Sequence, residues 1–124
     1  MNVVDSSGWL AYFTNGPKAP VYAPAIEDTE RLLVSTISLY EVYKKVLRER
    51  GEDTALFVTD VMRKGRLVKV NDEIALVGAR LSVQHRLAMA DSLILATARV
   101  HQATLWTQDA DFQGLDKVNY VEPA

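Results

Sequence analysis

The chain has 124 residues, of which 48% are hydrophobic and 24% are charged, and its formal net charge is −2. This balance is typical of one globular domain and excludes a disordered chain, a membrane-spanning protein and a protein that coats nucleic acid by bulk positive charge. Because cysteine is absent, a metal ion would have to bind oxygen or histidine, and we expect a single cytoplasmic domain over residues 1–124.

The first half of the sequence predicts strands at 2–4 and 32–36, both apolar and rich in β-branched residues. A helix follows the polar residues at 5–8 and ends at 15–17. Three prolines at 17–24 predict irregular chain, with a second helix only over 25–31. Helical spacing of apolar residues predicts a helix from Ser38 to Gly51 and another over 53–64.

The second half predicts a strand at 67–70 and then a helix capped by Asp72. A segment at 92–100 is apolar nearly all round, so we expect a buried helix that starts at Asp91. A strand at 103–107, an acidic turn through Asp109 and Asp111, and a short strand at 118–121 complete the chain. Strands that alternate with helices predict an α/β fold whose parallel sheet is covered on both faces.

Four acids are predicted at one edge of this sheet. Asp5 and Asp109 follow two strands, whereas Glu41 and Asp91 lie near the starts of helices that begin at the same edge. Carboxylates that share a cleft repel one another unless a cation is bound, and oxygen ligands suit Mg²⁺ or Mn²⁺. Such ions promote hydrolysis of phosphodiesters by activated water.

Each acid also has a structural explanation when it is considered alone. Asp5 and Asp91 stand where helix N-caps are expected, and the sequence SLYE at 38–41 matches a capping box that would occupy Glu41. Asp111 could serve the turn before Phe112. The combination at one edge, rather than any single residue, therefore favours a metal site.

Two basic clusters leave nucleic-acid binding open despite the negative net charge. One comprises Lys44, Lys45 and Arg48, and the other lies at 63–66. Both could contact phosphates, and both are also explained as solvated helix faces.

Four segments together resemble the acidic motifs of PIN-domain ribonucleases, most closely the VapC-type toxins of toxin-antitoxin systems. They are VVDSS at 3–7, SLYEV at 38–42, ADSLILATA at 90–98 and TQDADF at 107–112. The resemblance implies a three-layer PIN-like fold with a parallel sheet in the order 3-2-1-4-5, and an Mg²⁺- or Mn²⁺-dependent endoribonuclease. It also implies an RNA substrate, a small antitoxin whose tail enters the active-site groove, and a homodimer.

The resemblance also implies roles for individual residues. The catalytic acids would be Asp5, Glu41, Asp91 and Asp109, of which Asp5, Asp91 and Asp109 would bind metal, with Ser6, Thr107 and Asp111 in support. One position departs from the common pattern, because Gln108 stands where many members have a basic residue. This departure leaves the acids intact but weakens any prediction of phosphate contacts there.

Three other functions remain open from the sequence. A housekeeping PIN-type nuclease would share the same acids. A non-catalytic binding domain would use all of them as caps. A phosphoacceptor receiver domain has a similar length, but it needs paired acids after the first strand and an aspartate after the third. Here Asp5 is followed by two serines, and Asp72 is better explained as a cap.

Overall fold

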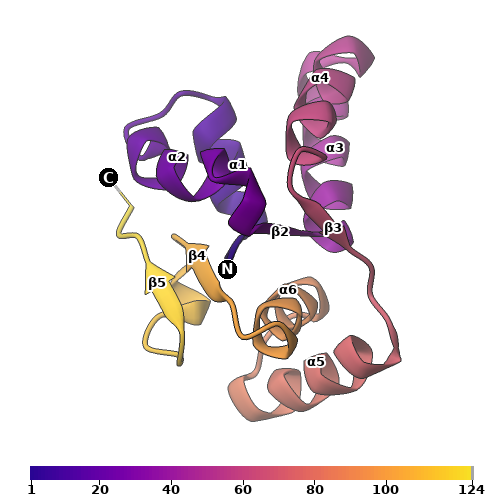
Figure 1. Cartoon of the computed structure of the whole chain (residues 1–124), viewed down its shortest axis with the longest axis vertical. Helices are drawn as coiled ribbons and strands as arrows, with labels where there is room; N and C mark the ends of the chain where they lie inside the picture. Colours follow the sequence, from indigo (N-terminus) through magenta and orange to yellow (C-terminus); the bar gives the residue numbers. More distant parts are fainter. Residues whose placement is uncertain (124) are drawn as a thin grey trace.

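The structure is a computed structural model and describes residues 1–123. Five parallel strands form one sheet in the order β3-β2-β1-β4-β5 (Figure 1). The strands are β1 (Asn2–Val4), β2 (Leu32–Ser35), β3 (Arg66–Val68), β4 (Thr104–Thr107) and β5 (Val118–Tyr120). In the central ladders Val3 pairs with Leu33 and with Leu105. The predicted α/β class and strand order are confirmed. A flavodoxin-like or receiver sheet would instead have the order 2-1-3-4-5.

Six α-helices and two short 3₁₀ helices connect the strands. They are α1 (Ser6–Phe13), α2 (Ala19–Glu27), η1 (Thr29–Arg31), α3 (Thr36–Arg50), α4 (Glu52–Met62), α5 (Asp72–His85), α6 (Met89–Val100) and η2 (Ala110–Phe112). None of the helices within residues 1–123 combines the length and hydropathy of a bilayer-spanning segment.

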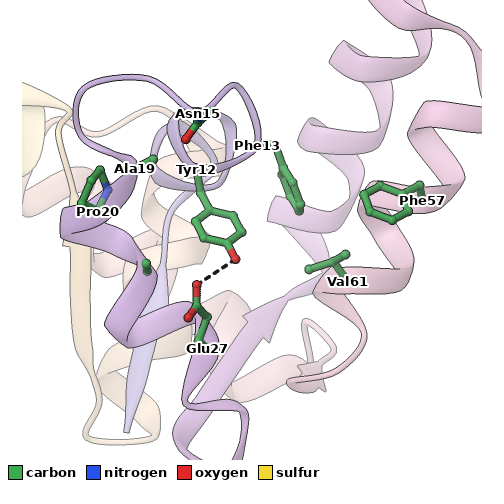
Figure 2. Close-up of a pocket in the computed structure, with 9 residues that line it drawn as sticks. Tyr12, Phe13, Asn15, Ala19, Pro20, Glu27, Phe57 and Val61 are labelled. Atoms are coloured by element: carbon green, nitrogen blue, oxygen red, sulfur yellow. Dashed lines mark hydrogen bonds between the residues drawn. The ribbon is translucent and has the colours of Figure 1, made fainter.

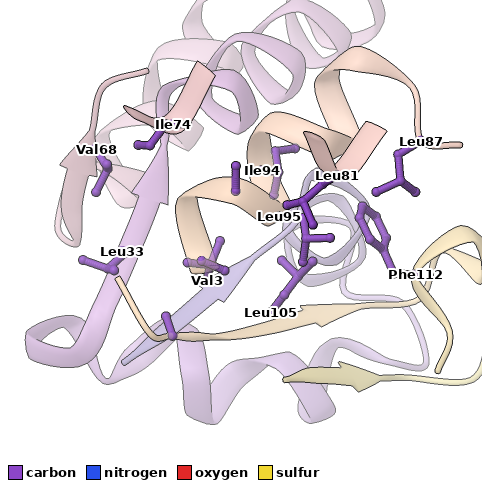
Figure 3. Close-up of a cluster of buried hydrophobic side chains, with 13 residues drawn as sticks. Val3, Leu33, Val68, Ile74, Leu81, Leu87, Ile94, Leu95, Leu105 and Phe112 are labelled. Carbon is purple, nitrogen blue, oxygen red and sulfur yellow. The ribbon is translucent and has the colours of Figure 1, made fainter. Parts of the chain in front are cut away.

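The sheet has a hydrophobic cluster on each face, because alternate strand residues point to opposite sides. Val3, Leu33 and Leu105 pack with Ile94 and Leu95 of α6, together with residues of α5 (Figure 3). Val4 and the other side chains of the opposite face pack with α1 to α4. The helix α6 is buried continuously from Ile94 to Ala98, as its apolar sequence predicts. The result is a three-layer arrangement.

The prediction of irregular chain before residue 25 is wrong. The helix α2 begins at Ala19, with a proline in its first turn, where the missing N–H costs nothing. Pro24 lies inside the helix. The helix persists because Tyr22, Ala25 and Ile26 are almost fully buried against the sheet, and this tertiary packing outweighs the local preference of proline.

Three predicted helix starts also differ from the structure. The cap of α3 is Ser35, whose hydroxyl accepts a hydrogen bond from the N–H of Ile37, so the helix begins before Ser38. The cap of α5 is Asn71, and not Asp72. The helix α6 begins at Met89, which places Asp91 inside its first turn rather than at a cap. These shifts change which of the nearby residues act as helix caps.

Candidate active site

Asp5 directly follows β1 and caps α1. Its Oδ1 accepts hydrogen bonds from the N–H of Gly8 at 2.9 Å and from the hydroxyl of Ser7 at 2.8 Å. Its Oδ2 accepts a third from the hydroxyl of Thr107 at 2.6 Å. Asp5 is only 4% exposed, and this burial raises the pKa of its carboxyl, while the three hydrogen bonds act to lower it. Asp5 therefore serves as a helix cap and lies at the carboxyl edge of the sheet.

Thr107 ends β4 and joins Asp5 to the loop that follows. A hydroxyl group has one proton to donate, and Thr107 directs it at Asp5. Its oxygen then accepts a hydrogen bond from the N–H of Asp109 at 3.0 Å. Asp109 in turn caps η2, with Oδ1 accepting from the N–H of Asp111 at 3.0 Å. A continuous chain of hydrogen bonds therefore runs from β1 to the acids after β4.

Asp91, Asp109 and Asp111 form a compact group, which we call the acidic trio. One carboxylate oxygen of each residue lies within 4.8 Å of those of the other two. Asp91 comes from the first turn of α6, and the other two come from the loop and the 3₁₀ helix after β4. Among residues 1–123, this is the only group of three or more potential metal ligands with such spacing.

Within residues 1–123, no cationic side chain forms an ion pair with the trio. Burial, and then the negative charges of Asp109 and Glu41, raise the pKa of Asp91 from its usual 3.8 to about 6. Asp5 and Asp111 add smaller contributions in the same direction. The five acids thus interact electrostatically at one edge of the sheet.

Glu41 reaches this edge from α3 and contacts α1. Its Oε1 accepts a hydrogen bond from the hydroxyl of Ser6 at 2.6 Å. The capping-box explanation of Glu41 is wrong, because Ser38 lies within the helix and Ser35 is the cap. The Glu41 carboxylate instead holds the first turn of α1 against α3, and its charge acts on Asp91.

Tyr22 belongs to this region, although no sequence motif indicated it. Tyr22 is fully buried, and its hydroxyl donates a hydrogen bond to Oε1 of Gln108 at 3.3 Å. Burial, followed by the charge of Asp5, raises the pKa of Tyr22. A Cβ atom on Gly8 would lie 2.6 Å from the Tyr22 ring, so only glycine permits this close packing. Tyr22 was hidden because it falls in a proline-rich segment where no helix was predicted.

The trio fits a hard divalent cation by the chemistry of its donors. All three side chains are carboxylates, which Mg²⁺ and Mn²⁺ prefer. Oxygens bound to one ion at about 2.1 Å lie at most about 4.2 Å apart, and the carboxylate oxygens of the trio, all within 4.8 Å of one another, are close to this spacing. A bound cation would also offset the mutual repulsion that raises the pKa of Asp91.

A second surface feature is an apolar groove between α1, α2 and α4. Phe13 and Phe57 face each other across it, and the Tyr12 hydroxyl donates a hydrogen bond to Glu27 at 3.1 Å on one side (Figure 2). Phe57 is 65% exposed. Trp9, by contrast, is fully buried in the core and offers nothing to a partner.

The sheet order and the carboxylate cluster at its edge define an α/β protein with a candidate divalent-cation site. The sequence profile of the PIN domain matches residues 3–118, and the chain therefore belongs to the PIN domain family. PIN domains are typically nucleases. A receiver domain is therefore excluded. Comparison with curated proteins finds no match to this chain.

Solved structures share this fold over almost the whole chain. A chain of a toxin-antitoxin complex from Klebsiella pneumoniae is 22% identical, with a TM-score of 0.80 and 96% of each chain covered. VapC20 of Mycobacterium tuberculosis, a sarcin-ricin loop cleaving toxin, is 17% identical, with a TM-score of 0.76, covering 99% of this chain and 100% of that chain. VapBC2 of Rickettsia felis, bound to a promoter DNA fragment, is 13% identical, with a TM-score of 0.75, covering 97% and 96%. The structural neighbours therefore include VapC toxins and toxin-antitoxin complexes.

Proposed function

We propose that this protein is a metal-dependent endoribonuclease and the toxin of a toxin-antitoxin pair. The observation that carries the proposal is the acidic trio, whose carboxylate oxygens lie within 4.8 Å of one another without a cationic side chain, in a PIN domain. The similarity to VapC toxins supports the choice of RNA as the substrate.

In this proposal Asp91 and Asp109 are the principal metal ligands, because the sequence motifs and the short distances both favour them. Asp111 completes the trio. When bound, a divalent ion would lower the pKa of a water molecule and stabilise charge on the phosphate oxygens. Asp5 keeps Thr107 and the Asp109 loop in register through its hydrogen bonds, and it adds negative charge beside the ion.

Glu41 and Ser6 complete the proposed site from the other side. The 2.6 Å hydrogen bond between them fixes the Glu41 carboxylate, which is free to bind metal directly or through water. No covalent intermediate on the protein is needed, because water is the nucleophile.

The test is cleavage of RNA by the purified chain, free of any partner, in Mn²⁺ or in EDTA. We expect cleavage only with Mn²⁺, and a loss of about 100-fold or more in Asp91→Asn, as is usual when a group that stabilises the transition state is removed. Asp60→Asn removes the same charge from an exposed position on α4 and serves as the matched control. Cleavage by Asp91→Asn at the parental rate would exclude the proposed site.

The proposed partner is a small antitoxin, and the apolar groove of Figure 2 supports this choice. Exposed Phe57 on α4, together with Val61 of the same helix and Phe13 on α1, offers a surface for the apolar face of a short amphipathic segment. Expression of the chain in bacteria should arrest growth, and co-expression of the cognate antitoxin should relieve the arrest. Phe57→Glu should prevent the relief but keep the arrest. An arrest by Asp91→Asn as strong as that by the parent would contradict the toxin assignment.

We also propose a homodimer. Leu76, Ala79 and Val83 lie on one exposed face of α5, and Leu76 and Val83 are 69% and 84% exposed. A short apolar strip of this kind can pack against its own copy across a two-fold axis. Light scattering should give twice the monomer mass for the parent, and the monomer mass for Val83→Glu.

A further inference from the structure

One face of α3 carries a row of three exposed side chains, Tyr40, Lys44 and Arg48, which we call the α3 ridge. Residues four apart lie above one another on a helix, separated by about 6 Å along its axis. Tyr40 is 61% exposed. The ammonium group of Lys44 lies 5.6 Å from the centre of its ring. The row therefore begins with an aromatic ring and continues with two cations.

The two cations of the ridge differ from a neighbouring lysine on the same helix. The adjacent row on α3 contains Lys45, whose ammonium group lies 3.2 Å from Glu49, so this charge is paired. Lys44 and Arg48 take part in neither of the ion pairs found in residues 1–123. The unpaired cations of the ridge remain available to a polyanion.

The ridge borders the proposed active site. Its three residues line the same shallow groove as Glu41. Glu41 is bonded to Ser6, and its charge contributes to the raised pKa of Asp91. The helix α3 starts at the carboxyl edge of the sheet and runs beside α4 (Figure 1). A strand of nucleic acid leaving the acidic trio past Glu41 would therefore meet the ridge first.

The other basic cluster has no such relation to the acids. Arg63, Lys64 and Arg66 lie before and at the beginning of β3, which runs parallel to its neighbour β2. The start of a parallel strand is at the edge opposite to the carboxyl ends. This cluster therefore lies at the other edge from the trio, and it offers a control with the same charges.

We propose that the α3 ridge binds single-stranded RNA next to the scissile phosphodiester, with Lys44 and Arg48 at phosphates and Tyr40 stacked on a base. This inference rests on the proposed ribonuclease function. An acidic site repels a polyanion, so cations beside it are needed to hold the substrate, and phosphate contacts fix its register. Aromatic stacking with flanking cations is the usual way to bind single strands without strict sequence preference.

The experiment measures binding of a fluorescent single-stranded RNA of about ten nucleotides to the full chain in EDTA, by anisotropy over a range of KCl concentrations. Lys44→Gln and Arg48→Gln should each reduce the slope of log affinity against log salt by about 0.7, because each removes about one phosphate contact. Tyr40→Ala should weaken binding by about fivefold or more without changing that slope, and Tyr40→Phe should retain affinity. Lys64→Gln should change neither quantity.

The inference is overturned if Lys64→Gln weakens binding as much as Lys44→Gln, because bulk charge would then explain it. It is also overturned if polyglutamate displaces the RNA at equal charge, because the ridge would then recognise an acidic protein segment. Binding in EDTA does not require cleavage. A ridge-dependent affinity without any cleavage in Mn²⁺ would therefore reject the proposed nuclease and leave the RNA-binding ridge in place.

Discussion

The two sides of the acidic edge accommodate negative charge in opposite ways. Around Asp5, protein donors occupy both carboxylate oxygens: a backbone N–H, a serine hydroxyl and a threonine hydroxyl. Around Asp91, three carboxylates approach one another within 4.8 Å, and no cationic side chain of residues 1–123 forms an ion pair with them. Asp5 is the more buried of the two, and its three hydrogen bonds act against the burial that raises its pKa.

This contrast suggests different roles within a single cluster: Asp5 positions its neighbours, whereas Asp91 is suited to bind a cation. A cation stabilises a carboxylate little when its oxygens already accept three hydrogen bonds, but removal of that carboxylate destabilises the fold strongly. A cation stabilises a carboxylate that is crowded by others, and removal of that carboxylate from the metal-free protein destabilises the fold little. The same substitution should therefore have opposite effects on the two sides.

The largest expected effect is on the Asp5 side. Asp5→Ala leaves a buried N–H and two hydroxyls without their acceptor, and it removes the cap of α1, which should cost about 3 kcal/mol in the free energy of unfolding. Asp91→Ala in metal-free protein should be neutral or stabilising. Urea unfolding in EDTA measures both, with Asp60→Ala as the exposed control. Equal losses of unfolding free energy in Asp5→Ala and Asp91→Ala would contradict the proposed difference between the two sides.

The next effect is the response to metal. Mn²⁺ at about a hundred times its dissociation constant should stabilise the folded chain by about 2.7 kcal/mol, which raises Tm by several degrees. Asp91→Asn and Asp109→Asn should abolish this rise, whereas Asp60→Asn should keep it. A full rise of Tm in both variants of the trio would mean that the ion binds elsewhere.

A smaller effect is expected from pH. The folded state binds the Asp91 proton more tightly than the unfolded state, because the pKa of Asp91 is raised from 3.8 to about 6. Its contribution to stability is therefore fully present below pH 3.8 and is lost as pH rises through about 6. Solvent screening at this partly exposed side chain reduces the size to about 1 kcal/mol.

The measurement is the difference in unfolding free energy between the parent and Asp91→Asn in EDTA, from pH 4 to pH 8. The parent should lose stability relative to the variant as pH rises, and Mn²⁺ should remove that loss. A difference that does not change with pH would contradict the shifted pKa.

The smallest effect tests the link between the two sides. Tyr22→Phe removes the 3.3 Å hydrogen bond to Gln108 and should cost about 0.5 kcal/mol. Because Gln108 lies between Thr107 and Asp109, the freed loop should also bind Mn²⁺ about two- to threefold more weakly, since outer hydrogen bonds orient metal ligands. Tyr12→Phe removes an exposed hydroxyl bond to Glu27 and should not alter Mn²⁺ affinity. Titration calorimetry distinguishes the two tyrosines.

Much of the fold was predictable because hydrophobic periodicity is a local property. The strands and the buried helix α6 agree with the sequence predictions, and the sheet order agrees with the order that the resemblance to PIN domains implies. The helix α2 was not predictable, because the burial of Tyr22 against the sheet outweighs its prolines. The true starts of α3 and α6 were also missed, because several nearby residues are able to act as caps.

The sequence by itself determined that the acids would follow strands or open helices at one edge of a parallel sheet, because strand direction and helix order follow from the pattern. Only the tertiary structure decided which of these acids lie close together and which accept hydrogen bonds from the protein. It brought Asp111 into the trio, gave Asp5 its three donors, and placed Glu41 against Ser6 and beside the α3 ridge. These outcomes depend on distances of a few ångströms between residues far apart in sequence, which packing sets and local pattern does not encode.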